Sequence, residues 1–198
     1  MRLLDEPPLF IARSFRAIEI DAARIPMLQQ FYESNPEYHL AVNGEPPGPT
    51  EARDEFESLP PAGWPYKKRW VLGFFDAQES MIGVANVISD LFAAGIWHIG
   101  LFIVATRLHG SGVAQILYAQ LESWMRGNGA LWLRLGVVEG NVRAERFWER
   151  SGYWDIRKRQ SVKMGKRLNT LRVMAKPLAA GSVSEYLAVV ERDRSESP

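Results

Sequence analysis

The sequence predicts a mixed α/β fold, and three observations support this prediction. Several short runs alternate apolar and polar residues, as half-buried strands do. Other segments repeat apolar residues every three or four positions, which is the spacing of an amphipathic helix. Between a strand-like run and a helix-like run lies the small-residue segment 104–114, VATRLHGSGVA. Together they predict packed layers of strands and helices, with a glycine loop at a strand-to-helix crossover.

The first half of the chain predicts four strands and two helices. The strands are the runs in which apolar residues alternate or dominate, residues 15–20, 69–75, 81–87 and 97–104. Asp21 is expected to cap a helix that extends to about Ser34, and a second helix covers residues 51–59. Residues 35–49 are rich in Pro, Gly and Asn, so we expect a loop there.

The second half predicts two amphipathic helices and three further strands. Apolar residues at helical spacing run from Val113 to Met125, and Gly127 and Gly129 follow as helix-ending residues. Asn141 is the expected N-cap of a second helix that reaches Arg150. The expected strands are residues 131–137, 154–164 and 170–175.

Length and charge predict one globular domain followed by a tail. We expect the domain over residues 1–178 and the tail over residues 179–198, with a candidate short helix over 182–192 and a frayed, charged end. The 24 basic and 23 acidic residues give a net charge of +1 without a basic stripe. Nucleic acid is therefore not an expected partner.

The absence of cysteine excludes disulfides, cysteine metal sites and cysteine nucleophiles, and it is consistent with a reducing compartment. The first residues, MRLLDEPP, lack the apolar core of a signal peptide. The uncharged residues 91–106 are shorter than the ~20 residues that span a bilayer. We therefore expect a cytoplasmic protein without membrane contact. His39, His98 and His109 show no metal-ligand spacing, so no metal is expected.

Residues 104–114 predict an anion site. A small-residue loop that opens a helix lets several backbone N–H groups point outward at the positive end of the helix dipole, which suits a phosphate. The loop has no Gly-Lys-Ser/Thr, and HGSGVA lacks the dinucleotide spacing Gly-x-Gly-x-x-Gly. A general nucleotide-binding protein is therefore disfavoured, while a purely structural turn fits the loop taken alone.

The loop resembles motif A of the GNAT superfamily, the acyl-CoA-dependent N-acyltransferases, which reads Gln/Arg-x-x-Gly-x-Gly/Ala. Two registers are available: one begins at Arg107 and matches at every position, and the other begins at His109 with His in the first place. The residues that flank the loop favour His109. Val104 lies five residues before it, and Leu117 and Tyr118 follow Ala114 at the family's helix-core positions.

A second block supports the resemblance. Residues 141–153, NVRAERFWERSGY, are similar to the family pattern Asn-x-x-Ala-x-x-(Leu/Phe)-Tyr-Glu-x-x-Gly-(Phe/Tyr). An N-capped helix with an aromatic core face explains part of this block, but it does not explain its place beside a phosphate site. The resemblance implies a central mixed, mostly antiparallel sheet flanked by helices, with a CoA site at the strand–glycine loop–helix junction.

The resemblance also implies the contacts with acetyl-CoA. Backbone groups of Phe102, Ile103 and Val104 would pair with the pantetheine arm, and Asn141 would bond the arm further along. The N–H groups of the loop would hold the diphosphate, from residues His109, Gly110, Ser111, Gly112, Val113, Ala114 and Gln115.

Trp148 is the main departure from the family pattern. The resemblance implies that Trp148 contacts the cofactor, and it stands where many family members have a Tyr that protonates the leaving thiolate. A Trp donates hydrogen bonds but cannot act as this acid. The role of the acid is left to Tyr153, to Tyr118 or to no residue at all. The last alternative is possible because a thiol has a pKa of about 8.5, so its thiolate is a tolerable leaving group.

The implied reaction is transfer of an acetyl group from acetyl-CoA to a primary amine by direct attack in a ternary complex. An alkylammonium has a pKa of about 10 and must first lose a proton. His98 is our first candidate for the base, since it lies eleven residues before His109, where some family members place a catalytic Glu. A hydrogen-bonded structural His and a water relay remain open, and Asp90 and Glu139 are weaker candidates.

The acceptor is expected to be a small-molecule or peptide amine, bound by the first helices and their loop. Tyr38 and Glu45 are the candidate binding residues, and the acidic run Asp54, Glu55 and Glu57 favours a cation or is simply a solvated helix face. Two alternatives remain: an enzyme of this fold that uses a longer acyl-CoA, and a CoA-binding regulatory module without catalysis. We expect a monomer or a homodimer.

Overall fold

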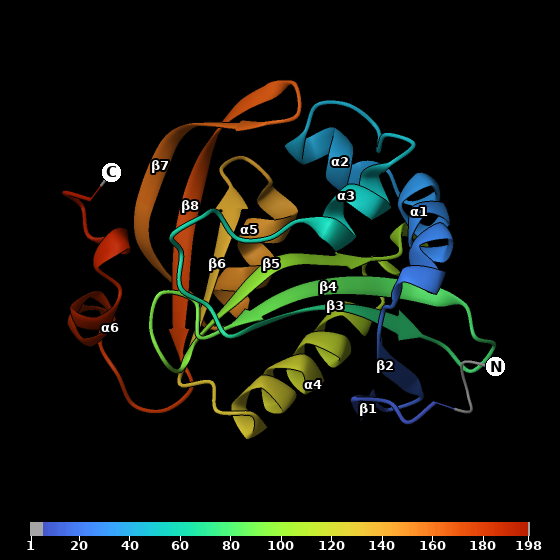
Figure 1. Cartoon of the computed structure of the whole chain (residues 1–198), viewed down its shortest axis with the longest axis horizontal. Coiled ribbons are helices and arrows are strands. Elements are labelled where there is room, and N and C mark those ends of the chain that lie inside the picture. The colour runs from blue at the N-terminus through green and yellow to red at the C-terminus, as the bar shows by residue number, and fades with distance from the viewer. Residues whose placement is uncertain (1–5, 198) are drawn as a thin grey trace.

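The computed structural model describes residues 6–197 and places one sheet at the centre of the molecule (Figure 1). Within this range the strands are β1 (Phe10–Ala12), β2 (Phe15–Glu19), β3 (Lys68–Phe75), β4 (Met81–Ser89), β5 (Ile96–Val104), β6 (Trp132–Val138), β7 (Trp154–Met164) and β8 (Arg167–Pro177). Their order across the sheet is β1-β2-β3-β4-β5-β6-β8-β7. Neighbours are antiparallel except β5 and β6, which are parallel. The predicted mixed, mostly antiparallel sheet is confirmed.

Helices cover both faces of the sheet (Figure 1). They are α1 (Ile25–Ser34), α2 (Glu37–Val42), α3 (Glu51–Glu57), α4 (Val113–Gly127), α5 (Val142–Arg150) and α6 (Val183–Val189), with 3-10 turns η2 (Ala22–Arg24), η3 (Thr106–Leu108) and η4 (Glu191–Asp193). Leu117 of α4 packs in one core cluster with Leu72, and Leu28 of α1 packs in another with Val71. Successive strand residues point to opposite faces, so each face has its own core. None of the helices in residues 6–197 has the length and apolar character needed to cross a membrane.

The expected loop over residues 35–49 contains the short helix α2, so that prediction is wrong for six of its residues. Pro36 precedes the helix with a φ of −73°, which is already helical, and His39 and Val42 turn their side chains into the protein. Gly44 follows with a φ of +77°, a left-handed conformation that ends the helix. The Pro, Gly and Asn that suggested a loop are therefore the boundaries of a helix.

The N-terminal strand β1 was not predicted from the sequence. It has three residues, too few to show an alternating pattern, and it pairs with β2 in the register Phe10↔Ala17. Phe10 also packs against Trp124 of α4, with ring centroids 5.8 Å apart. Residues 1–5, which begin the polar start of the chain, lie outside the described residues.

The C-terminal tail docks on the protein. α6 occupies the region of the candidate short helix and begins with a capping box between Ser182 and Glu185. Tyr186 and Val190 pack in a small cluster with Ile96 of β5. The tail is thus packed rather than frayed as far as residue 197, and that part of the prediction is wrong.

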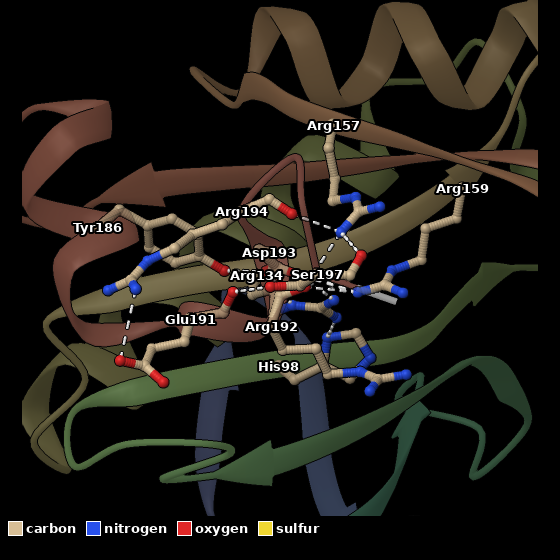
Figure 2. A network of polar contacts seen from close by, with 10 residues as sticks. All are labelled: His98, Arg134, Arg157, Arg159, Tyr186, Glu191, Arg192, Asp193, Arg194 and Ser197. Carbon is tan, nitrogen blue, oxygen red and sulfur yellow. Dashed lines mark hydrogen bonds and ion pairs between the residues drawn. The ribbon is translucent and has the colours of Figure 1, made fainter.

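A clamp of arginines from β7 holds the end of the tail (Figure 2). Arg157 donates to the carbonyl oxygens of Arg192, Arg194 and Ser197 at 3.2, 2.6 and 2.8 Å, and Arg159 donates to the carbonyl of Arg192 at 2.7 Å. In these bonds the two guanidinium groups replace water as partners of the carbonyl oxygens, and they attach the charged segment to β7.

Candidate active site

The strands β5 and β6 separate part of the way along their length. Their parallel pairing extends from Ile96↔Trp132 to Ile99↔Leu135 and stops there. Beyond it, β5 pairs only with β4, and β6 pairs only with β8. The edge of β5 that includes Phe102, Ile103 and Val104 therefore has no ladder partner on the β6 side, and an extended ligand can pair with it as an added strand.

A bulge in β5 lies at the start of this unpaired edge. Asn86 of β4 pairs with Leu101 and the next residue, Val87, pairs with Ile99, so Gly100 is the extra residue. Such bulges redirect a strand and are common beside active sites. Gly100 is exposed, unlike its buried neighbours Ile99 and Leu101.

The glycine loop follows β5 and opens the 15-residue helix α4. Gly110 and Gly112 have φ values of +80° and +83°, and a Cβ at either position would meet no atom within 4 Å. The first N–H groups of α4 have no intrahelical partner. The N–H groups of His109 and Ser111 donate to the carbonyl oxygens of Thr106 and Leu108, and that of Val113 donates to Oγ of Ser111. An anion would therefore bond to the other N–H groups of the loop and of the first turn of α4. The first turn of α4 contains no acidic residue. The loop is therefore an open cradle for an anion.

His109 is held against the end of β5. Its Nε2 lies 3.0 Å from the carbonyl oxygen of Val104 and donates to it, and its Nδ1 accepts from Nη1 of Arg143. The imidazole thus links the strand, the loop and α5 instead of pointing outward. Arg143 adds a guanidinium beside the cradle. Arg143 was not predicted from the sequence, although its place in the block 141–153 was an available signal.

Trp148 lies in an aromatic cluster under β5. It is 7% exposed, and its ring centroid is 5.4 Å from that of Tyr118 and 5.3 Å from that of Tyr153. Phe102 of the unpaired edge packs on the same ring at 5.9 Å. Trp148 therefore supports the strand from below, and its predicted contact with the cofactor remains a prediction.

Neither tyrosine of this cluster is well suited to protonate a thiolate. Burial raises the pKa of Tyr118, and its contacts with Tyr153 and Glu122 raise it further. Burial likewise raises the pKa of Tyr153. A thiol with a pKa of about 8.5 is a stronger acid than either hydroxyl, so transfer of their protons to the thiolate is unfavourable.

His98 faces a buried ion pair (Figure 2). Its Nδ1 lies 3.3 Å from Nη1 of Arg134, and Arg134 pairs with Asp193 through two bonds of 2.8 Å. Burial and the adjacent Arg134 charge lower the pKa of His98 to about 3. A ring that accepts from a guanidinium through Nδ1 carries its proton on Nε2, so neither nitrogen is left as a base. The base role of His98 stays a prediction, and these contacts argue against it.

We expect His98→Gln to keep kcat within about threefold of the wild-type value, because catalysis by a positioned base is worth far more, about 10²–10⁴-fold. The pH profile of kcat should also keep its shape. The measurement is thiol release from acetyl-CoA at saturating amine between pH 5 and 9. A drop of about 100-fold with loss of the acidic limb would restore His98 as the base.

The two weaker base candidates have structural partners. Oδ1 of Asp90 accepts from the backbone N of Gly95 at 2.7 Å, inside the turn before β5. Glu139 forms an ion pair with Lys158 of β7. Neither lines the cavity described next. Among residues 6–197, no group of three or more His, Asp or Glu side chains is placed to hold a metal ion.

A polar cavity of about 230 Å³, which we call the α2–α3 pocket, lies beside the bulge of β5. Its lining includes Gly100 and Leu101, together with side chains of α1, α2 and α3. Those that carry polar groups are Tyr32, Tyr38, His39, Glu51 and Glu55. Strand β5 thus has an unpaired edge toward β6, and the residues at its bulge line a polar cavity.

The structure separates the two predicted acceptor residues. Tyr38 lines the α2–α3 pocket. Glu45 is outside the lining and forms an ion pair of 2.7 Å with Lys166 at the tip of the β7–β8 hairpin. Both remain predictions as substrate contacts. In the sequence, Glu55 is only one member of an acidic run, and Glu51 was not predicted as a site residue. The helix pattern alone does not show which of these carboxylates turn inward.

Strand β5 thus combines an unpaired edge that leads to the glycine loop with a polar pocket at its bulge. A family model described as "Acetyltransferase (GNAT) family" matches residues 28–153. The chain belongs to the GNAT acetyltransferase family. No curated protein matches this sequence.

Solved structures share this fold at low sequence identity. An acetyltransferase from Thermus thermophilus is 18% identical with a TM-score of 0.65, over 85% of this chain and 100% of that one. Spermidine N-acetyltransferase from Vibrio cholerae, in complex with CoA and spermine, is 15% identical with a TM-score of 0.63, over 88% and 98%. The ribosomal-protein-S18-alanine N-acetyltransferase from Escherichia coli is 13% identical with a TM-score of 0.60, over 85% and 96%.

Proposed function

We propose that this protein transfers an acetyl group from acetyl-CoA to a primary amine held in the α2–α3 pocket, by direct attack in a ternary complex. The observation that carries this proposal is the double role of β5. Its unpaired edge leads to the anion cradle, and its bulge residues Gly100 and Leu101 line the pocket. An acyl donor on the edge and an amine in the pocket would therefore meet at one strand.

The residues present fit acetyl-CoA. The open cradle at Gly110 and Gly112 leaves room for a diphosphate against backbone N–H groups. Backbone groups of residues 102–104 would pair with the pantetheine arm. Asn141 caps α5 by accepting from the N of Ala144 through Oδ1, so its contact with the arm would use the amide Nδ2. The bound cofactor supplies the thioester carbonyl.

One group of the chain itself would assist the chemistry. A backbone N–H on the unpaired edge of β5 would stabilise the oxyanion that forms when the amine attacks the carbonyl. Since the sequence contains no cysteine, direct transfer is simpler than a cysteine-bound acyl-enzyme. The structural neighbours are named for different acceptors, spermidine and a ribosomal protein among them, so the fold leaves the amine open.

A CoA-binding module without catalysis is the second candidate. The observation that favours it is Trp148, which fills with an indole the position where many family members offer a hydroxyl. A longer acyl-CoA is the third alternative, and it differs only in the donor.

Isothermal calorimetry distinguishes these donors. We expect acetyl-CoA and CoA to bind with similar heats, because both carry the diphosphate and the arm. ATP should bind much more weakly because it lacks the arm that pairs with β5. Tight binding of ATP without detectable heat from acetyl-CoA at millimolar concentration would contradict the proposal, and clearly tighter binding of longer acyl-CoA would favour the third alternative.

A further inference from the structure

We propose that Glu55 is the group that takes the proton from the acceptor ammonium in the α2–α3 pocket. This assignment rests on the proposed function, and it names a catalytic residue that the sequence patterns did not indicate.

Glu55 lines the pocket, and only one of its carboxylate oxygens has hydrogen-bond partners among the described residues. Oε1 accepts from Nη2 of Arg69 at 2.9 Å and from Nδ2 of Asn86. Among the described residues, Oε2 has no hydrogen-bond partner, and the Glu55 side chain is 26% exposed. Arg69 is itself fixed, since Nη1 donates to the carbonyl of Phe56 at 3.0 Å. Arg69 and Asn86 thus hold the carboxylate through Oε1, and Oε2 is left without a protein partner among the described residues.

Asn86 joins this carboxylate to the bulge of β5. Its backbone pairs with Leu101, and its amide nitrogen bonds Glu55. The amide carbon of the same side chain lies 3.6 Å from the position that a Cβ of Gly100 would occupy. Glu55 therefore lies one amide group away from the point where β5 leaves its regular ladder. An amine in contact with Oε2 would be beside the strand that we expect to hold the thioester.

The other groups that face Glu55 make the pocket suitable for a cation. Arg69 of β3 is the basic neighbour, and its guanidinium is already paired with the Glu55 carboxylate. Glu51 of α3 is a second carboxylate, 3.5 Å from Nε2 of His39 on α2. Burial lowers the pKa of His39 and raises the pKa of Tyr32 and Tyr38, so these three groups are neutral near pH 7.

Two buried polar atoms in the lining support a polar ligand at this place. The Tyr32 hydroxyl and Nδ1 of His39 have no hydrogen-bond partner in residues 6–197, although their side chains are 1% and 3% exposed. Such buried groups destabilise the protein unless a ligand or solvent bonds them. They flank the same cavity as Glu55.

Burial raises the pKa of Glu55, although the bond from Asn86 and the charge of Arg69 oppose this effect. A carboxylate with a raised pKa is a stronger base, so it takes a proton from an ammonium at a smaller energetic cost. The environment thus improves Glu55 for the role that its geometry suggests.

The proton balance of the step is simple. The ammonium R–NH₃⁺ transfers one proton to Oε2, which leaves R–NH₂ and a neutral Glu55. The nitrogen lone pair forms the C–N bond to the thioester carbonyl carbon, the C–S bond then breaks, and the electron pair leaves on sulfur. The attacking nitrogen gives its extra proton to the thiolate, and Glu55 returns its proton to solvent. The products are the acetamide, CoA thiol and one proton.

The test compares Glu55→Gln with the wild type, using an amine that the wild type acetylates. Gln keeps the size of the side chain and an oxygen for Asn86 and Arg69, but it cannot accept the proton. We expect kcat to fall about 10²–10⁴-fold, with the KM for the amine changed much less. The acidic limb of the kcat–pH profile should disappear, while the affinity for acetyl-CoA in calorimetry stays within twofold.

Glu33→Gln is the matched control. Glu33 is an exposed carboxylate on α1, next to the pocket residue Tyr32, and it bonds only Gln29 among the described residues. This variant should retain the wild-type kcat and pH profile. A general effect of removing one negative charge near the pocket would appear in both variants.

Asn86→Ala gives a second readout that does not depend on Glu55→Gln folding. The bond from Asn86 lowers the pKa of Glu55, so its loss should move the acidic limb to higher pH. A limb that stays in place would contradict the assignment.

The outcomes separate the two proposals. If Glu55→Gln keeps its kcat and its acidic limb, or raises only the KM, Glu55 is not the base, although the enzyme proposal stands. If the wild type binds acetyl-CoA but acetylates no amine, the proposed function fails, and the assignment of Glu55 fails with it.

Discussion

Asp193→Asn is expected to lower the free energy of unfolding by about 3–5 kcal/mol, the usual cost of breaking one side of a buried ion pair. Its carboxylate is fully buried and accepts from Nε and Nη2 of Arg134, both at 2.8 Å, and from the Tyr186 hydroxyl at 2.6 Å. The side chain of Arg134 is 7% exposed, so it would be left as an uncompensated buried charge (Figure 2). Because the tail carries Asp193 onto β6, this one substitution should also loosen the tail.

Thermal and urea unfolding measure this effect. For a chain of this size, the expected loss corresponds to a Tm lower by roughly 6–20 °C. Glu191→Gln is the control, since Glu191 lies two residues away in the same turn and is 78% exposed in its surface pair with Arg194. It should change stability by less than about 0.5 kcal/mol. Equal stability of Asp193→Asn and wild type would show that the tail does not depend on this ion pair.

The effect should depend on pH in a defined direction. Burial alone would raise the pKa of Asp193, but the bonds and charge of Arg134 outweigh burial and lower it. A carboxyl with a lowered folded-state pKa stabilises the fold above its unfolded value of about 3.9, and this contribution is lost as the pH falls through the folded pKa. The stability gap between wild type and Asp193→Asn should therefore be widest above about pH 5 and should narrow below about pH 4.

Gly112→Val is expected to weaken acetyl-CoA binding by roughly 10- to 100-fold. Gly112 has a φ of +83°, which a β-branched residue adopts only at a cost of about 1–2 kcal/mol, so the loop would shift. Its side chain would also project into the open space of the anion cradle. Loss of one hydrogen bond to a charged diphosphate costs about 1.5–3 kcal/mol, and each 1.4 kcal/mol corresponds to a tenfold change.

Gly129→Val is the matched control for this binding experiment. Gly129 lies just after the other end of α4, with a φ of +97° and no atom within 4 Å of a Cβ. The two variants should lose similar stability, but Gly129→Val should keep the wild-type affinity in calorimetry. Comparable affinity loss in both variants would indicate a general effect on α4 instead of a cradle at Gly112.

The sequence was most informative where periodicity and capping chemistry act locally. The apolar face of α4, the N-cap Asn141 of α5 and the alternation in β6 each fix an element within one segment. The glycine loop was also predictable, because its conformation depends on residues that tolerate positive φ. The 3-10 turn η3 inside the loop and the contacts of His109 with Val104 and Arg143 required the structure.

The remaining features depend on contacts between distant segments. Asp193 was expected in a frayed end because its partner, Arg134, is 59 residues away and lies inside a strand. Glu55 looked like one acidic residue among several on α3, and only the packing of α3 on β3 and β4 brings it to Arg69 and Asn86. His98 also depends on a distant contact. An imidazole of ordinary pKa suits a base, but Arg134 lies against Nδ1 of His98 and its charge helps to lower that pKa.

The most direct test of the enzyme proposal is thiol release from acetyl-CoA across a panel of amines, amino acids, peptides and aminoglycosides, with mass detection of the products. We predict that at least one amine gives thiol release well above the hydrolysis background, with a product heavier by one acetyl group. Tight binding of acetyl-CoA without amine-dependent thiol release for any member of the panel would contradict the enzyme proposal and favour a CoA-binding module.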